Sequence, residues 1–165
     1  MLKAIRWSLP AFIICGMLVT LGSCTSLELY ERSVPLPGHQ WKSEYIPSFD
    51  FIITDTTARY DVALVFRHRD RYHYNNVWLQ LSLTDPQGKN YSFETDLLLG
   101  TNESGWLGAG MDDIYEHRIS LQKDLVAQGV SFRKAGTYHF RIKQLMREDP
   151  LEEVMNVGIR IEKKP

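Results

Sequence analysis

Residues 59 to 89 read RYDVALVFRHRDRYHYNNVWLQLSLTDPQGK, and this stretch contains two runs in which apolar side chains recur at every second position. Successive side chains of a β-strand point to opposite sides, so this period predicts strands with one buried face. The predicted inward positions are Tyr60, Val62, Leu64 and Phe66 in the first run, and Val77, Leu79, Leu81 and Leu83 in the second. The segment that follows, DPQGK, contains Pro86 and Gly88 and predicts a turn.

The same two-residue period continues on both sides of this stretch. Further predicted strands cover residues 49–53, 90–99, 115–121, 136–145 and 154–162. A helical turn is expected at most between Lys123 and Gln128. About seven short strands joined by turns, without a long amphipathic helix, are typical of an antiparallel β-sandwich of the immunoglobulin-like or jelly-roll-like kind. We therefore predict a single all-β domain.

The N-terminus has the pattern of an export signal. Lys3 and Arg6 precede an apolar run from Trp7 to Thr20, and a run of about 14 residues is short for a membrane-spanning helix, which needs roughly 20. The run ends in Leu-Gly-Ser-Cys at 21–24, which resembles the lipobox of bacterial lipoproteins, where the thiol is acylated and cleavage occurs just before it. We expect Cys24 to be the lipid anchor; the alternative is an ordinary signal peptide whose cleavage site contains a cysteine.

This pattern divides the chain into a signal peptide (1–23), a lipidated N-terminus and tether (24–47) and the β-sandwich domain (48–165). Extended or turn backbone is favoured in the tether by Pro35, Pro37, Gly38 and Pro47. We expect such a tether to set the domain some distance off the lipid surface.

The two cysteines also bear on the fold. Cys15 would leave with the signal peptide and Cys24 would carry lipid, so the domain is expected to have no disulfide and no thiolate metal site. The formal net charge is −1, and no basic run alternates with aromatic residues, so we expect no nucleic-acid partner.

The loop RHRDRYHYNNVW at 67–78 is the most distinctive polar segment. His68, Asp70 and His73 suggest a metal site, but their spacing fits neither a helical pair nor one face of a strand. A second interpretation is a loop that packs and bonds only to itself. A third is an exposed surface for a sugar or a protein partner, formed by Tyr72, Tyr74, Trp78 and Trp106. Against it stands the alternative that the loop GWLGAG covers Trp78.

Other polar segments are best interpreted as turns and solvated loops without a catalytic role. The run GWLGAGMDD at 105–113 lacks a dinucleotide or phosphate-loop pattern, and its glycines are expected to allow positive φ. Its acidic residues, with Glu116, suggest either Ca²⁺ binding or a solvated turn. His139 is expected to face solvent, and the acidic pairs that flank Pro150 are expected to be solvated. No Ser/His/Asp set can be assembled, so we expect no enzyme, no cofactor and no resident metal.

The blocks YHYNNVWL, WLGAGMDDIYEH, MREDPL and VGIRIEK closely resemble the gliding-motility lipoprotein GldH family. The resemblance covers most of the chain beyond the signal peptide; one departure is Glu152-Glu153, where a Pro or Gly turn is expected.

The resemblance implies a cell-envelope lipoprotein, expected at the outer membrane, of the set required for surface gliding and coupled to a dedicated protein secretion system. It carries over no catalytic residues, so the implied role is a non-enzymatic assembly or scaffold subunit whose partners are its membrane and other motility or secretion proteins. The alternative is a glycan-binding envelope module.

Overall fold

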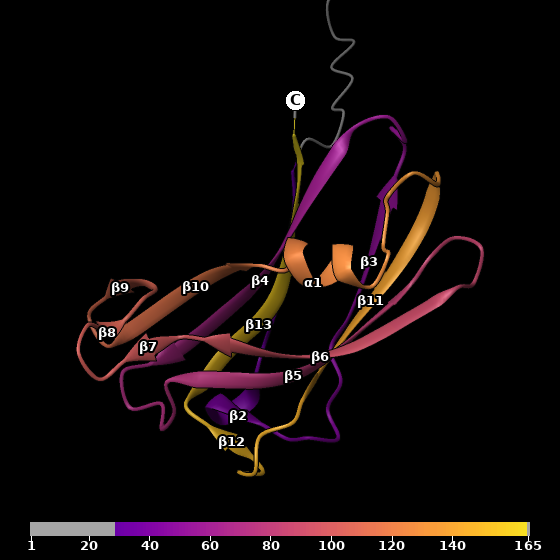
Figure 1. Cartoon of the computed structure of the whole chain (residues 1–165). Helices are drawn as coiled ribbons and strands as arrows, with labels where there is room; N and C mark the ends of the chain where they lie inside the picture. Colours follow the sequence, from indigo (N-terminus) through magenta and orange to yellow (C-terminus); the bar gives the residue numbers. More distant parts are fainter. Residues whose placement is uncertain (1–28, 165) are drawn as a thin grey trace, which may run out of the picture.

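The computed structural model describes residues 29–164, and the predicted signal peptide and Cys24 lie outside these residues. The described chain forms two packed antiparallel sheets, which confirms the predicted all-β sandwich (Figure 1). The first sheet has the order β1 (Leu29–Pro35), β13 (Val154–Lys164), β4 (Arg59–Arg69), β10 (Ile114–Ser120) and β9 (Ala109–Met111). The second has the order β3 (Ser48–Ile53), β11 (Gly136–Gln144), β5 (Asn76–Thr84) and β6 (Asn90–Leu98).

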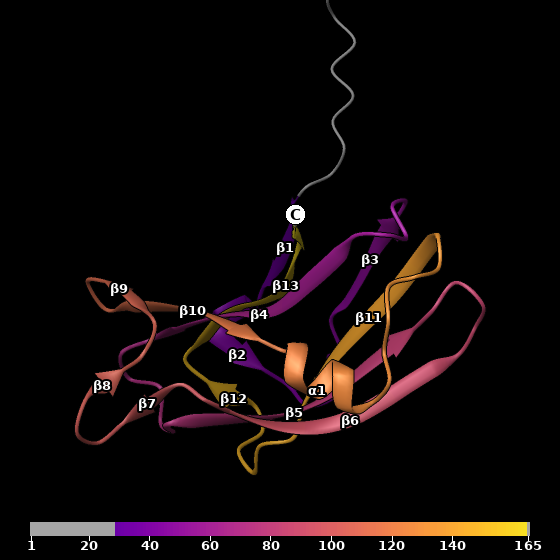
Figure 2. The ribbon, with the colours of Figure 1, turned by 45° about the horizontal axis from the view of Figure 1, so that its top comes forward.

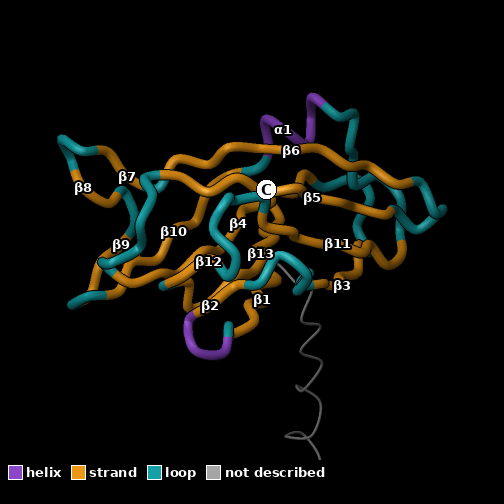
Figure 3. Tube along the Cα trace, turned by 90° about the horizontal axis from the view of Figure 1, so that it is seen from below, coloured by secondary structure: helices purple, strands orange, loops and turns teal. Residues whose placement is uncertain are grey.

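Small elements complete the domain. Two two-stranded pairs join β2 (Gln40–Trp41) to β12 (Leu151–Glu152) and β7 (Gly100–Thr101) to β8 (Gly105–Trp106). The helices are a 3₁₀ turn at Pro37–His39 and α1 (Gln122–Ala127), close to the helical turn predicted there. The Thr95 hydroxyl of β6 donates to the Asp124 carboxylate of α1 at 3.2 Å, and Figure 3 shows α1 beside β6.

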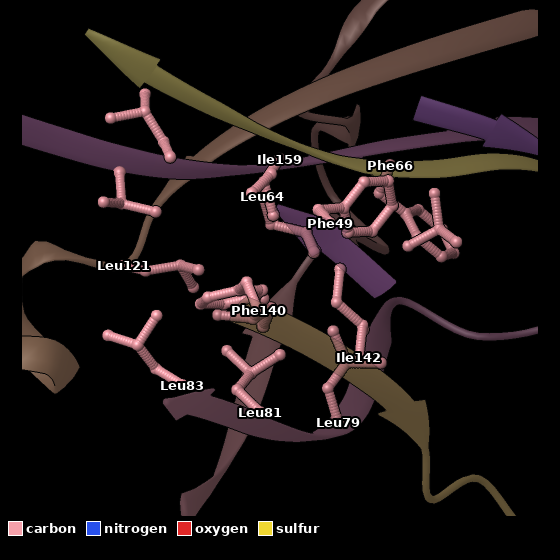
Figure 4. Packing of buried hydrophobic residues seen from close by; sticks show 14 of the residues in the cluster. Phe49, Leu64, Phe66, Leu79, Leu81, Leu83, Leu121, Phe140, Ile142 and Ile159 are labelled. Atoms are coloured by element: carbon pink, nitrogen blue, oxygen red, sulfur yellow. The ribbon is translucent and has the colours of Figure 1, made fainter. Parts of the chain in front are cut away.

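The two-residue period is confirmed as the origin of the core. All eight inward residues predicted for β4 and β5 are buried, and those of β5 have no exposed area. Side chains from both sheets meet between the layers, as Figure 4 shows. Residues from strands far apart in sequence meet there, including Phe49, Leu64, Leu81, Phe140 and Ile159. Apolar burial of this kind is the main favourable contribution to folding.

The domain begins earlier than the boundary expected at residue 48. Strand β1 pairs along its whole length with β13, from Leu29 opposite Glu162 to Pro35 opposite Asn156. Leu36 and Trp41 are buried in the core. Residues 29–47 therefore belong to the sandwich, and their prolines end β1 and shape the return to β3 rather than form a spacer.

The sandwich has two distinct ends. At the end that we call the terminal end, β1 begins, β13 finishes and the β3–β4 turn lies; Arg59 is opposite Lys164 there. The last residues of β13 and the β3–β4 turn share one side in Figures 1 and 2. At the other end, the loop end, lie the connections 70–75, 99–109 and 145–153.

Candidate interaction surface

Of the four aromatic residues predicted to form one surface, three lie together: the rings of Tyr74 and Trp106 each contact the Tyr72 ring, whereas Trp78 makes no ring contact with them in the described structure. Tyr72 is a core residue with 4% exposure, and its hydroxyl donates to the backbone oxygen of Asn76 at 3.1 Å. Its ring packs edge-on against Phe66, with 5.8 Å between the ring centroids. The prediction that Tyr72 is exposed is therefore wrong, because the 70–75 loop folds its tyrosine inward.

Trp106 covers this part of the core. Its ring lies edge-on to His68 at 4.4 Å between centroids, and its Nε1–H donates to the Asp70 carboxylate at 2.9 Å. The loop GWLGAG therefore covers His68 and Tyr72. The alternative interpretation, in which this loop covers Trp78, is wrong. Tyr74 is half-buried at the rim, 5.9 Å from the Tyr72 ring. We call Tyr72, Trp106, His68, His117 and Tyr115 the Trp106 cluster.

A buried histidine pair lies at the centre of the Trp106 cluster. His68 has no exposed area, His117 is 3% exposed, and their Nε2 atoms are 2.9 Å apart. The Nδ1 of His68 lies 2.7 Å from the Arg69 backbone oxygen, and since a carbonyl only accepts, Nδ1 carries the proton. The Nε2 of His68 must then accept from the Nε2–H of His117.

Both imidazoles of this pair are neutral in the folded protein. Burial lowers the pKa of His68, and burial together with the neighbouring His68 lowers the pKa of His117 to about 4. The sequence interpretation missed the pair because it considered His68 with its neighbours in sequence. The available signal was parity, since His117 shares the inward face of Tyr115 and Ile119.

The residues proposed as a metal site separate in the structure. Asp70 accepts from Trp106, and His73 at the surface lies 3.1 Å from the Glu148 carboxylate. Between residues 29 and 164, no group of three or more His, Cys, Asp or Glu side chains is arranged to hold a metal ion.

The acidic loops are held by specific partners. Glu116 pairs with Arg67 and Arg118, and Asp113 lies 3.8 Å from Arg69. The pairs flanking Pro150, expected to be solvated, bond across the fold: Glu148 to His73, Asp149 to Ser43, Glu152 to Gln40 and Glu153 to Arg71. That expectation is wrong because the 145–153 loop returns against the 39–45 and 71–73 segments.

Glycines of the GWLGAG loop act mainly through size. Gly105 has a φ of 69°, as expected, but Gly108 and Gly110 are not positive-φ positions. A Cβ on Gly108 would lie 2.6 Å from the Glu116 backbone oxygen and 2.9 Å from the His117 ring. In the Glu152-Glu153 segment, Glu153 itself adopts a φ of 62°, the conformation that the expected glycine would favour.

Trp78 does lie on the surface, as predicted. It is 42% exposed on the outer face of β5, opposite Asp96 of β6, while its backbone oxygen accepts from the Leu145 N–H at 2.9 Å. Its diagonal neighbour on the same face is Leu98, which is 55% exposed and pairs with Asn76. Leu107, also 55% exposed, follows on the next loop.

These three residues form what we call the apolar strip: Trp78, Leu98 and Leu107. The sequence interpretation named only Trp78. Leu98 was detectable because it is the one apolar residue on the outward parity of Ser92, Glu94 and Asp96. Leu107 gave no sequence signal, since its position depends on the loop that carries it.

The apolar strip leads into a groove of about 490 Å³ between the edges of the two sheets. Leu98 and Leu107 line one side, and residues 116–120 of β10 line the other. Strand β9 covers β10 only as far as Glu116. The Leu121 N–H donates to the Val62 oxygen of β4, so by alternation the backbone groups of Arg118 and Ser120 point away from β4, toward the groove.

In the described part of the chain, no helix is long and apolar enough to cross a membrane.

Comparison with known proteins gives one consistent family. A profile described as GldH lipoprotein matches residues 28–161. The chain is 27% identical to a gliding motility lipoprotein GldH homolog of Christiangramia forsetii, over 96% of this chain and 98% of the relative. It is 26% identical to the gliding motility lipoprotein GldH of Flavobacterium johnsoniae, over 88% of this chain and 91% of the relative. No solved structure matches the chain.

Proposed function

Since the chain belongs to the GldH lipoprotein family, we propose that it is a non-enzymatic assembly subunit of the envelope machinery for surface gliding and its linked protein secretion. Its anchor is a lipid on Cys24, and its membrane is the outer membrane. In this proposal the domain binds another protein of that machinery through the apolar strip. Both relatives carry gliding motility in their names, and the matches extend over most of each chain.

The apolar strip is the observation that carries the binding role. Trp78, Leu98 and Leu107 are each more than two-fifths exposed, yet they lie next to one another on a domain with a well-packed core. Contiguous exposed apolar residues mark interaction sites, and tryptophan is enriched among the residues that contribute most to binding. The free edge of β10 beside the strip offers backbone groups to an extended segment of the partner.

The histidines support a non-enzymatic role. His68 and His117 are the buried imidazoles of the domain, and each uses its Nε2 to bond the other. A general base must reach the proton that it removes from a substrate. A pair closed beneath Trp106 is instead suited to fixing the loop end of the sandwich.

Site-specific photo-crosslinking tests the binding role. We expect a crosslinking amino acid at Leu107 to yield a defined adduct with an envelope protein in cells, and Trp78→Ala with Leu98→Ser to abolish that adduct. Ile52→Ser is the matched control, because Ile52 is an exposed apolar residue on β3 at the terminal end. An adduct that persists in the Trp78/Leu98 variant, or disappears equally in the control, contradicts the proposal.

The glycan alternative is separated by titrating the purified protein with envelope polysaccharides. A saturable change in tryptophan fluorescence that Trp78→Ala removes would favour the glycan-binding module. The proposed assembly role predicts no such change.

The anchor is tested by metabolic labelling with a fatty-acid analogue. Cys24→Ala should remove the labelled band and leave an unprocessed chain, since no other residue in the lipobox has a thiol. Labelling that persists would refute the assignment of Cys24.

A further inference from the structure

The terminal end of the sandwich is held close to any lipid on Cys24. Four residues, 25–28, separate Cys24 from Leu29, the first residue of β1. Even a fully extended chain from Cys24 to Leu29 covers at most about 18 Å. The tether is therefore short, and the expectation of a domain set off from the lipid surface does not fit the pairing of β1 with β13.

The terminal end contains a hollow of about 640 Å³. Strand β10 ends at Ser120, opposite Ala63, so the first residues of β4 have no strand on that side. The segment 130–133 lies across this gap, and the Phe132 ring packs edge-on against Tyr60 at 6.1 Å between centroids. Leu125 of α1 closes the apolar floor.

Two arginines line the rim of this hollow. Arg59 and Arg133 are both exposed. Neither guanidinium forms an ion pair or side-chain hydrogen bond with another residue between 29 and 164. The one carboxylate in the lining, Asp61, lies 3.6 Å from Lys164. The hollow is therefore lined by more positive than negative side chains, and the N–H donors of its two arginines have no side-chain partner among the described residues.

An unsatisfied buried amide also lines the hollow. Gln122 lines the hollow, and its Oε1 is buried without a hydrogen-bond partner in the described structure. Buried polar atoms are normally bonded, so an orphan in a hollow indicates a missing partner. Half a turn of the amide presents its Nε2–H to an anion instead.

The hollow is within reach of the membrane. Arg59 pairs with Lys164, two residues beyond Glu162, which pairs with Leu29. Arg59 therefore lies further toward the terminal end than Leu29, the residue at which β1 begins. Strands β1 and β4 are separated only by β13, a lateral distance of about 10 Å.

We propose that the terminal end rests on the membrane surface and that the hollow between Arg59 and Arg133 binds the phosphate of a lipid headgroup. Arginine forks match phosphate oxygens well, and the lipid bilayer is the phosphate source to which the tether confines the domain. This inference rests on the proposed acylation of Cys24. It also places the apolar strip, which lies toward the loop end, away from the lipid.

Depth-dependent quenching of single fluorophores tests this orientation. The lipidated mature protein is reconstituted into vesicles of phosphatidylethanolamine and phosphatidylglycerol that contain a headgroup spin-labelled lipid. A fluorophore is attached at Ile52→Cys, at the terminal end, or at Met111→Cys, toward the loop end; both sites are strongly exposed. We expect quenching several-fold stronger at position 52 than at 111.

The headgroup site is tested with a charge-matched pair of variants. Arg59→Gln with Arg133→Gln should weaken association of the domain with the surface by roughly thirtyfold, seen as loss of most of the quenching at position 52. Arg141→Gln with Lys143→Gln is the control, because it removes the same charge from β11, away from the hollow, and it should leave the quenching unchanged. Circular dichroism serves to check that all variants are folded.

The outcomes separate the inference from the proposed function. Equal quenching at 52 and 111 in protein whose mass shows acylation overturns the orientation but leaves the anchor intact. Equal effects of the two double variants overturn the headgroup site. Saturable binding of inorganic phosphate to the detergent-solubilised protein, without an effect of the arginine variants on quenching, assigns the hollow to free phosphate instead. A mass without acyl chains refutes the anchor itself.

Discussion

Trp78 and Trp106 are both tryptophans, but Trp106 packs against the core whereas Trp78 is exposed on the surface. Trp106 donates to Asp70 and covers a buried histidine, whereas the Trp78 ring remains 42% exposed although its backbone is bonded on β5. Residue type alone therefore does not decide whether a tryptophan packs in the core or remains available for binding. The deciding factor is whether another segment folds over the side chain.

The largest expected effect is a loss of stability in the Trp106 cluster. Tyr72→Ala removes a ring that is 4% exposed and leaves a cavity against Phe66, so the free energy of unfolding should fall by about 3–5 kcal/mol in a denaturant titration. Tyr72→Phe keeps the ring and loses only the bond to Asn76, at a cost of about 1 kcal/mol. If the alanine variant were as stable as the phenylalanine variant, the cluster would not be part of the core.

The histidine pair predicts how stability depends on pH. The pKa of His117 falls from an ordinary value of 6.5 to about 4 in the folded protein, so the unfolded chain binds more protons between these values. The contribution of His117 to the free energy of unfolding is therefore fully present above pH 6.5. It is lost as the pH falls toward 4, by on the order of 3 kcal/mol. Unfolding measured across this range should show a shallower slope in His117→Phe. A slope in His117→Phe equal to that of the wild type would contradict this prediction.

The glycine beside the pair predicts a smaller effect. Gly108→Ala places a methyl group 2.6 Å from the Glu116 backbone oxygen, which cannot move without disturbing β10. We expect a cost of about 1–3 kcal/mol and altered near-ultraviolet dichroism of Trp106. Ala109→Ser, on the exposed neighbour, should stay within about 0.5 kcal/mol of the wild type. Equal stability of the two variants would contradict close packing of this loop.

The smallest effect on stability is expected on the apolar strip. Trp78→Ala should change the free energy of unfolding by about 1 kcal/mol or less, because the ring already contacts water in the folded state. The same substitution should nevertheless weaken capture of the partner, whereas Tyr72→Phe should not. A Trp78 variant that unfolds as readily as Tyr72→Ala would place Trp78 in the core and remove the contrast between the two tryptophans.

Much of the sandwich was predictable because strand burial is a local, periodic signal. The inward residues of β4 and β5 were identified from parity alone, and all of them are buried. The domain boundary predicted at residue 48 lies too late in the chain, because the two-residue period of β1 is interrupted by Arg32 between Tyr30 and Val34. Its place in the sheet depends on β13, which lies more than a hundred residues further along the chain.

The candidate site was less predictable for the same reason. Parity correctly placed Trp78 outward and was able to reveal Leu98, but it did not apply to the loops that carry Tyr72 and Trp106. A loop side chain has no periodic neighbour to fix its direction, so its burial depends on which other segments fold against it. The ion pairs of the 145–153 loop and the hollow at Arg59 and Arg133 likewise join segments distant in sequence.

The sequence by itself determined the all-β class, the faces of the main strands and the family resemblance, and it predicts the acylated cysteine. Each depends on residues close together in the chain, where side-chain alternation and short motifs act directly. Only the tertiary structure decided that Trp106 closes over a histidine pair, that Trp78 joins Leu98 and Leu107, and that Arg59 and Arg133, without side-chain partners among residues 29–164, share a hollow at the terminal end. These arrangements require contacts between distant segments, and such contacts exist only once burial of the core has brought the two sheets together.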